Sequence, residues 1–371
     1  MRAPVQNPIV IAAGGTGGHF FPAEALAAAL LDRGARVVLM TDARSGGLNS
    51  PAFAHAERHV LAGAGLSGRS LRRAIAGAIA LVRGVVQARR IMRGLRPAAV
   101  VAFGGYPAVP PVLAARLLGR RPQIVLHEQN AVLGRANRLL ARFADLLVLS
   151  FATTKAVPAT VSTAVLGNPV RPAVMALHAQ GFVPPAERIE LLVLGGSLGA
   201  KIFGTLIPAA LALLPAALRA RLHVVQQCRA QEQDEARAIF AAAGIAAELS
   251  PFFADVAERL RRAHLVIARA GASTVAEIAV VGRPAIFIPL PSAIDDHQRA
   301  NAEALADHNA AWVAPQAGLT PQALAARIES LLMNTETLKM AADRAAQAGR
   351  PDAASCLAER VLRMTQAQVR P

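Results

Sequence analysis

Several absences narrow the possibilities for this chain of 371 residues. Two cysteines, Cys228 and Cys356, are too few for a disulfide framework or a multi-cysteine zinc site, so we expect a reducing compartment. The longest uncharged stretches, Pro97–Ala115 and Phe203–Leu218, are interrupted by proline or glycine, and neither predicts a membrane-spanning helix. The N-terminus lacks the basic and then apolar pattern of a signal peptide. We therefore expect a soluble, cytoplasmic protein, with two domains because one core seldom carries so long a chain.

Acidic residues are missing from a long part of the first half. Residues 58–127 contain twelve arginines and no Asp or Glu, so this segment carries +12 of the formal net charge of +16. An arginine-biased genome would explain why only three lysines accompany 37 arginines, but it would not explain the missing acids. The imbalance predicts a basic patch that faces an anionic partner.

Within this segment, residues Ser70–Met92 have the periodicity of one helix. Its aliphatic side chains fall on one stripe: Leu71, Ile75, Ile79, Val82 and Val86. Arginines fall on the adjacent sector: Arg69, Arg72, Arg83, Arg90 and Arg93. The stripe either packs into the core between solvated arginines or meets anionic lipid together with them, where each arginine contributes on the order of 1 kcal/mol.

Short β-branched runs alternate with helical stretches rich in Ala, Leu and Arg, a pattern typical of parallel α/β units. The first half contains these predicted strands: Ile9–Ala13, Arg36–Thr41, Ala98–Phe103, Gln123–His127 and Leu146–Ser150. The second half contains these: Ile189–Leu194, His223–Gln227, His264–Ala268, Ala285–Ile288 and Ala311–Val313.

A proline-rich stretch near residues 168–185 separates the two halves. We therefore expect two Rossmann-like, doubly wound domains with parallel sheets, over residues 1–172 and 173–350, followed by residues 351–371. Ligands of such domains bind beyond the carboxyl ends of the strands, so the cleft between the domains is the expected site.

The first glycine loop, Gly14-Gly15-Thr16-Gly17-Gly18-His19, lies between a predicted strand and a predicted helix. Its glycines let backbone amides approach a diphosphate. A dinucleotide fingerprint would need a third glycine where Phe20 stands, and no Walker lysine follows; Asp42, after the second strand, is the one feature that favours NAD. His19 would be neutral at a helix N-terminus and could accept a proton near pH 7, or it could cap the turn. No second histidine lies at metal-ligand spacing from it.

The second half contains two more candidate phosphate loops, Gly195–Ala200 and Arg269–Glu277. Ser273 or Thr274 could cap a helix whose first turn contains Glu277. That carboxylate could accept hydrogen bonds from ribose hydroxyls, or it could close a capping box within its own helix. Two such loops and a carboxylate in one domain predict a nucleoside diphosphate site.

The run Asp295-Asp296-His297-Gln298 follows another predicted strand. Gln298 could bind a sugar. The two carboxylates and the histidine are an incomplete ligand set for a metal.

Six motifs occur in a fixed order: Gly14–His19 with Pro22-Ala23, Phe103–Tyr106, His127–Asn130, Gly167–Arg171, Gly195–Ala200 and Gly271–Glu277. With these motifs the chain resembles, over about residues 8–350, the MurG family of UDP-N-acetylglucosamine transferases in glycosyltransferase family 28. The resemblance implies a GT-B fold of two Rossmann-like domains that face each other across a cleft, and an inverting reaction without a cofactor or an essential metal. It also implies a C-terminal helix, roughly Ala353–Met364, that packs back on the first domain.

The reaction implied by the resemblance is transfer of N-acetylglucosamine from UDP-N-acetylglucosamine to the 4-hydroxyl of the muramyl sugar of undecaprenyl-diphosphate-MurNAc-pentapeptide (lipid I). The product is lipid II, the peptidoglycan precursor. Such an enzyme would be a peripheral protein on the cytoplasmic face of the bacterial inner membrane, with cell-wall synthesis proteins as further partners and no nucleic acid. Its acid-free segment would lie against anionic lipid.

The resemblance also assigns residues to sites. The donor site would comprise Thr16, Gly17, Gly18, Asn130, Arg171, Ser197, Phe253, Ala272, Ser273, Thr274, Val275, Ala276, Glu277 and Gln298. The acceptor diphosphate would lie against Gly14, Gly15, Gly104, Gly105 and Tyr106. The membrane would meet Ile75, Ile79, Val82, Val86, Arg72, Arg83 and Arg90.

Among the donor residues, Glu277 would hold the ribose, Gln298 the sugar, and the backbone of Phe253 the uracil. His19 is the first candidate for the general base and Glu128 the second. The chain departs from the family at Gly204, where asparagine is common, and in the apolar run Leu290–Ile294.

Two alternatives remain at this stage. Another GT-B glycosyltransferase could use a different UDP-sugar or a lipid acceptor such as diacylglycerol. A basic RNA-binding protein is the alternative from another class, although one Trp and one Tyr leave few stacking platforms for bases.

Overall fold

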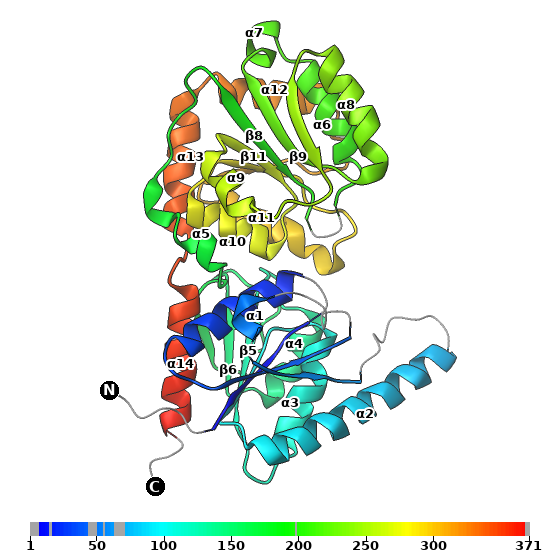
Figure 1. Cartoon of the computed structure of the whole chain (residues 1–371), viewed down its shortest axis with the longest axis vertical. Helices are drawn as coiled ribbons and strands as arrows, with labels where there is room; N and C mark the ends of the chain where they lie inside the picture. The colour runs from blue at the N-terminus through cyan, green and yellow to red at the C-terminus, as the bar shows by residue number, and fades with distance from the viewer. Residues whose placement is uncertain are drawn as a thin grey trace. The chain divides into compact units, whose positions relative to one another are not determined.

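Two parallel β-sheets form the framework of the chain in its computed structural model, which describes residues 7–14, 17–43, 50–54, 56–62, 71–196 and 199–367. The chain divides into two compact units: Met1–Arg171 with Asp352–Pro371, and Pro172–Pro351. The C-terminal segment is therefore part of the first unit (Figure 1).

The first unit contains a seven-stranded sheet in the order β3-β2-β1-β4-β5-β6-β7. Its strands are β1 (Ile9–Ala12), β2 (Val37–Thr41), β3 (Glu57–Val60), β4 (Ala99–Ala102), β5 (Gln123–Glu128), β6 (Leu146–Leu149) and β7 (Thr163–Val165). Its α-helices are α1 (Gly17–Leu31), α2 (Leu71–Leu95), α3 (Val109–Arg116), α4 (Arg135–Leu140) and α14 (Ala353–Ala367).

Alternate residues of these strands pack against opposite helical layers, as a sheet that is buried on both faces requires. Val10 and Ala12 belong to a core that contains residues of α2, α3 and α4. Ile9 and Ile11 face a second core, which α1 and α14 cover. In that core Leu357, Ala358 and Val361 of α14 pack with the apolar face of α1, so α14 completes the first unit (Figure 1).

The second unit contains a six-stranded sheet in the order β10-β9-β8-β11-β12-β13. Its strands are β8 (Ile189–Leu194), β9 (Leu222–Gln227), β10 (Ala246–Ser250), β11 (Leu265–Ala268), β12 (Ala285–Phe287) and β13 (Ala311–Val313). Its α-helices are α5 (Pro172–Met175), α6 (Phe203–Ala212), α7 (Ala216–Arg219), α8 (Gln233–Ala242), α9 (Val256–Arg262), α10 (Ala272–Val281), α11 (His297–Ala306), α12 (Pro321–Leu332) and α13 (Thr335–Ala348).

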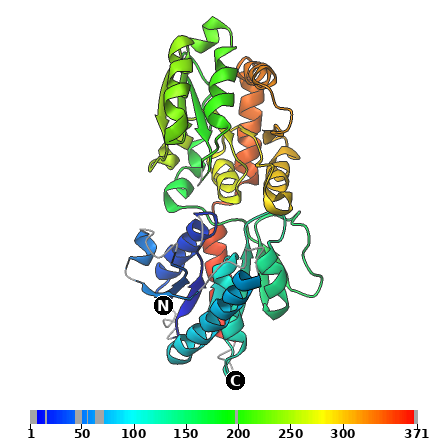
Figure 2. The same ribbon diagram turned by 90° about the vertical axis from the view of Figure 1, so that its right-hand side faces the viewer.

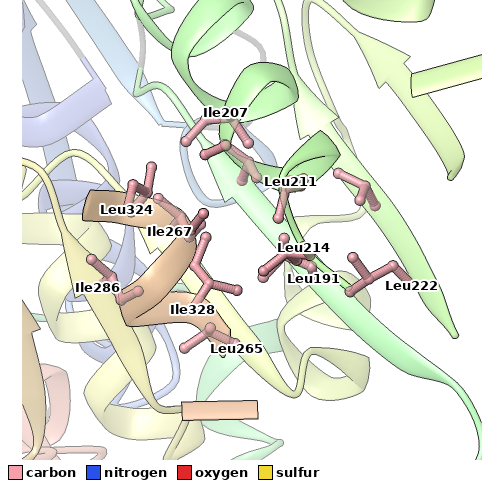
Figure 3. Packing of buried hydrophobic residues seen from close by; sticks show 14 of the residues in the cluster. Leu191, Ile207, Leu211, Leu214, Leu222, Leu265, Ile267, Ile286, Leu324 and Ile328 are labelled. Carbon is pink, nitrogen blue, oxygen red and sulfur yellow. The ribbon is translucent and has the colours of Figure 1, made fainter. Parts of the chain in front are cut away.

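One face of this second sheet packs against α6, α8 and α12. Figure 3 shows the centre of that core, where Leu191 and Ile267 of the sheet meet Ile207, Leu211 and Ile328 of the helices. Three other helices of this unit also pack together, with α10 in contact with both α11 and α13. The two sheets are parallel throughout and have equivalent strand orders, which confirms the predicted class of two doubly wound α/β domains.

All ten predicted strands are present, with ends that differ by at most one residue. Sequence reasoning missed three strands, β3, β7 and β10, and each of them lies at an edge of its sheet. Their residues are largely exposed or half-buried, because an edge strand is not covered on both sides as a central strand is. They therefore lack the continuous apolar run that identified the others.

The long helix α2 buries one face and exposes the other. Gly84, Ala88 and Met92 face the core, and a Cβ on Gly84 would lie only 2.4 Å from the backbone oxygen of Ala62, so glycine permits close packing there. The aliphatic stripe faces outward instead: Ile75, Ile79, Val82 and Val86 are 49–62% exposed. For these four residues the interpretation of the stripe as core is therefore wrong; the side chain of Leu71, the fifth member, lies outside the described residues.

Candidate active site

In both sheets a glycine loop lies at the topological switch point, where successive strands begin to be added on the other side of the first strand. In the first sheet β1 lies between β2 and β4, and in the second β8 lies between β9 and β11. Loops that follow such a central pair diverge to opposite faces of the sheet, and ligands of doubly wound domains bind in the crevice between them. The loops at this point are those after β1 and β4 in the first unit and those after β8 and β11 in the second.

The loop after β1 passes close to the end of β2. A Cβ on Gly14 would lie 2.9 Å from Oδ1 of Asp42 and 3.0 Å from Oγ1 of Thr41, so only glycine fits there without displacing neighbours. Gly15 and Thr16 lie outside the described residues. Gly17 and Gly18 open helix α1.

The loop after β4 contains Gly104 and Gly105, which have φ angles of +77° and +67°. Other residues rarely adopt such angles, so both positions favour glycine. A Cβ on Gly104 would lie 3.2 Å from the Asn137 amide, and one on Gly105 would lie 3.4 Å from Nε2 of His19. Tyr106 then begins a short 3₁₀ helix. The two loops of the first unit therefore meet at His19.

His19 is the third residue of α1 and is half-buried. Its Nδ1 lies 2.8 Å from Oε1 of Gln129, which follows β5. An amide oxygen can only accept, so Nδ1 carries the proton and Nε2 carries the lone pair. The lone pair of a neutral imidazole is what a general base needs.

Glu128, the second candidate base, is 2% exposed and makes four hydrogen bonds. Its Oε1 accepts from the backbone and side-chain nitrogens of Asn130, both at 3.0 Å. Its Oε2 accepts from the backbone of Gly134 at 2.8 Å and from Nδ2 of Asn137 at 2.9 Å. Four donors occupy the sites at which a carboxylate would take a proton, so Glu128 fits a structural anchor for residues 130–137 better than a base.

In the second unit, Gln227 at the end of β9 fixes the start of the loop after β8. Its Oε1 accepts from the backbone of Gly195 at 3.1 Å, and its Nε2 donates to the oxygen of Gly196 at 3.1 Å. Ser197 and Leu198 lie outside the described residues. A Cβ on Gly199 would lie 2.8 Å from Cγ of Arg229, which therefore packs against this loop.

Gly204, where the resemblance predicts asparagine, is closely packed. A Cβ at this position would lie 2.5 Å from Cβ of Glu232 and 2.9 Å from its Cγ. Glu232 is held there by its ion pair with Arg229. A side chain at position 204 would therefore crowd the Arg229–Glu232 pair.

Helix α10 begins directly after β11, with its N-terminus at the carboxyl edge of the sheet. Its N-cap is Gly271, which has no side chain, so the prediction that Ser273 or Thr274 caps the helix is wrong. For the same reason no Ser/Thr–Glu capping box forms, and Glu277 lies in the second turn rather than the first. Glu277 is nevertheless buried, at 7% exposure.

Two further donor-site candidates lie on other parts of the second unit. Phe253 follows β10 and is 6% exposed, with the Arg259 guanidinium 4.0 Å from its ring centroid. Gln298 is in the first turn of α11, and its Oε1 accepts from the backbone of Leu290 at 3.0 Å. Gln298 therefore holds the apolar run Leu290–Ile294 at the end that follows β12.

The first unit carries the remaining donor candidates. Asn130 lies beside Glu128, as described, and Arg171 stacks its guanidinium 5.2 Å from the ring centroid of Phe21 on α1. Sequence reasoning gave no role to His127 or Gln129, although both belong to a motif that it had singled out. Among the described residues no group of three or more His, Cys, Asp or Glu could hold a metal ion.

Comparisons with known proteins agree with this architecture. Residues 9–148 match the glycosyltransferase family 28 N-terminal domain, and residues 190–357 match the glycosyltransferase family 28 C-terminal domain. A protein of Granulibacter bethesdensis is 59% identical over 97% of this chain and 94% of its own length. One of Acidiphilium cryptum is 57% identical over 100% of both chains. Both are named UDP-N-acetylglucosamine–N-acetylmuramyl-(pentapeptide) pyrophosphoryl-undecaprenol N-acetylglucosamine transferase.

Among solved structures, the crystal structure of Acinetobacter baumannii MurG superposes with a TM-score of 0.75 and 32% identity, over 96% of this chain and 99% of that one. Fold and loops thus define a GT-B glycosyltransferase. Because both family domains and full-length relatives match, the chain belongs to glycosyltransferase family 28. Among the helices in the described part of the chain, none combines the length and the apolar content needed to cross a bilayer.

Proposed function

We propose that this enzyme transfers N-acetylglucosamine from UDP-N-acetylglucosamine to undecaprenyl-diphosphate-MurNAc-pentapeptide, giving lipid II for peptidoglycan synthesis. The observation that carries the proposal is the 59% identity, over 97% of this chain, to a relative named for this reaction. Five of the six sequence motifs lie within the two matched family domains, and the sixth, Gly167–Arg171, lies between them.

The chemistry requires a base for the acceptor hydroxyl and stabilisation of the departing UDP. His19 is suited to be the base, because its Nδ1 is engaged by Gln129 and its Nε2 lies beside Gly105. The acceptor diphosphate would then lie against Gly14, Gly104 and Gly105, the glycines of the loops after β1 and β4.

The donor diphosphate would lie at the N-terminus of α10. The amides of its first turn carry the positive end of the helix dipole, and Gly271 contributes no side chain that would cover them. Glu277, one turn further along the same helix, would accept hydrogen bonds from the ribose hydroxyls. Gln298 and Phe253 would complete the sugar and uracil contacts.

A transfer assay with radiolabelled UDP-N-acetylglucosamine and a short-chain lipid I analogue tests this function. We expect lipid II as the product and a clear preference over UDP-glucose and UDP-galactose. Preference for a sugar without the acetamido group, or for diacylglycerol as acceptor, would instead identify another GT-B lipid glycosyltransferase.

Two substitutions test the site. His19→Ala should lower kcat by at least about 10²-fold, the usual contribution of general-base catalysis. Glu277→Ala should raise KM for UDP-N-acetylglucosamine by about 10- to 100-fold, since it removes hydrogen bonds to a charged group. Glu336→Ala, which changes an exposed carboxylate of the same unit, is the matched control. Unchanged constants in either variant would remove that residue from the site.

The outer face of α2 is proposed to bind the membrane that holds the lipid acceptor. It combines the exposed aliphatic stripe with exposed arginines such as Arg83 and Arg90. Leu117, which follows α3, is also exposed, at 57%, and its backbone oxygen accepts from Nε of Arg89 on α2. Figure 2 shows α2 at the front of its unit, along the outside.

Binding to anionic phosphatidylglycerol vesicles at 0.15 M salt tests this surface. Arg83→Ala with Arg90→Ala should weaken binding by about 2 kcal/mol, or roughly 30-fold, at about 1 kcal/mol per arginine. Arg237→Ala with Arg327→Ala removes two exposed arginines of the second unit and should change little. Tight RNA binding without vesicle binding would favour the nucleic-acid alternative.

A further inference from the structure

We propose that His127 and Gln129 are positioning residues that fix the proton of His19 on Nδ1 and so keep its Nε2 free to act as a base. The three side chains form one chain of hydrogen bonds, from the backbone oxygen of Gly167 to the imidazole of His19. The inference rests on the proposed role of His19 and explains how a neutral histidine is held in a single tautomer.

The backbone carbonyl of Gly167 fixes which groups donate and which accept along this series of hydrogen bonds. Nε2 of His127 lies 3.1 Å from the oxygen of Gly167, which can only accept, so this nitrogen carries a hydrogen. His127 is completely buried and stacks on Phe103, with ring centroids 5.1 Å apart. Burial lowers the pKa of His127 to about 4, so the ring is neutral near pH 7 and its Nδ1 has a lone pair.

The backbone carbonyl of His127 fixes the orientation of the Gln129 amide, in the middle of the series. Nε2 of Gln129 lies 3.1 Å from the backbone oxygen of His127 and 3.0 Å from its Nδ1. Only an NH₂ group can satisfy both of these acceptors, so the amide of Gln129 has one orientation. Its Oε1 must then face His19, where Nδ1 lies 2.8 Å away.

At the other end of the series, Nε2 of His19 can accept a proton. With its hydrogen on Nδ1, His19 presents the lone pair of Nε2 beside Gly105. If Gln129 were absent, either nitrogen could carry the proton, and the molecules with Nε2–H would be unable to accept one. The buried pair therefore selects the reactive tautomer without touching a substrate.

Nitrogen-15 NMR of histidine-labelled protein, without substrates, measures the tautomer directly. The chain has nine histidines, and the His19→Ala spectrum identifies the signals of His19. We expect Nδ1–H and an unprotonated Nε2 in the native protein, and loss of this preference in Gln129→Met. Gln226→Met, which removes another buried amide, should leave the His19 signals unchanged. A native His19 protonated at Nε2 would overturn the proposal.

Kinetics provide the second readout. Gln129→Met should lower kcat by about 10- to 100-fold with KM for UDP-N-acetylglucosamine changed less than twofold, because only proton transfer is affected. In a His19→Ala background the same substitution should cause no further loss, since the tautomer no longer matters. An equal loss in both backgrounds would show a merely structural role and refute the inference.

Gln129→Glu, the second variant if Gln129→Met fails to fold, keeps an oxygen that can accept from Nδ1 of His19 and should therefore retain the Nδ1–H tautomer. Its other oxygen faces the two acceptors of His127, so this variant should be less stable than the native protein. Loss of the Nδ1–H tautomer in folded Gln129→Glu would contradict the proposal. The NMR result does not depend on turnover. A native protein that shows the Nδ1–H tautomer but makes no lipid II would disprove the proposed function and leave the positioning role standing.

Discussion

Replacing Glu128 by Gln separates a structural role from a catalytic one. Each carboxylate oxygen of Glu128 accepts two hydrogen bonds, at 2.8–3.0 Å, and the side chain is 2% exposed. In the amide, one oxygen becomes an NH₂ group that faces two donors. Two buried or half-buried donors then lose their acceptor.

The size of the effect follows from those two bonds. A hydrogen bond to a charged group contributes about 1.5–3 kcal/mol, so Glu128→Gln should lower the free energy of unfolding of the first unit by roughly 3–6 kcal/mol. At a urea dependence of about 2 kcal/mol per M, in the middle of the typical range, the midpoint should fall by roughly 1.5–3 M.

The chain provides its own internal reference for this measurement. Its one tryptophan, Trp312, lies in β13 of the second unit. Tryptophan fluorescence therefore follows the second unit, whereas far-ultraviolet circular dichroism follows both. Urea unfolding of Glu128→Gln should show an early dichroism transition and an unshifted fluorescence transition.

Glu57→Gln, on the edge strand β3, is the control, because its exposed ion pair with Arg36 should contribute no more than about 1 kcal/mol. The reasoning is refuted if Glu128→Gln unfolds like the native protein while kcat falls by about 10²-fold or more. That combination would mean that the carboxylate takes part in proton transfer.

Three further predictions concern stability. Leu357→Ala, in the fully buried face of α14, should destabilise the first unit by about 2–5 kcal/mol and leave the Trp312 fluorescence transition in place; a shift of both transitions would contradict it. Because burial lowers the pKa of His127 to about 4, the unfolded chain binds a proton below pH 6.5 that the folded state does not, so stability should fall from pH 6.5 toward pH 4, by about 2 kcal/mol at pH 5 relative to pH 7. His127→Asn should lack this contribution, and an identical pH profile would refute it. Gly204→Asn should lower the melting temperature by crowding Glu232, and Glu232→Ala in the same chain should restore it; destabilisation that persists in the double variant would locate the clash elsewhere.

The sequence predicts the centre of each sheet better than its edges. Strands such as β1 and β8 are buried on both faces, so their apolar runs are continuous and adjoin a glycine loop. The residues of β3 and β7 are all exposed or half-buried, and they carry no such run. The three missed strands extend the sheets without altering the position of any loop, so the fold class was still predictable.

The candidate site divides in a similar way. Glycine loops are visible in sequence because close approach and positive φ angles require glycine, as at Gly104. The partner of His127 lies forty residues away, on a backbone oxygen that any residue type could supply. Periodicity alone likewise did not reveal that Val82 is exposed, whereas Gly84 packs closely against the backbone of Ala62. Long-range hydrogen bonds and the choice of a buried face need the folded chain.

The dependence of the first unit on α14 also bears on how the chain folds as it is synthesised. Residues 172–351 must leave the ribosome before the last helix does, which takes roughly 10–40 s at about 5–20 residues per second. Throughout that interval the nascent first sheet lacks part of the cover over α1, including Val361. The aliphatic surface of α1 that α14 will cover stays exposed while the second unit is translated. This is the stage at which a chaperone would bind the emerging polypeptide.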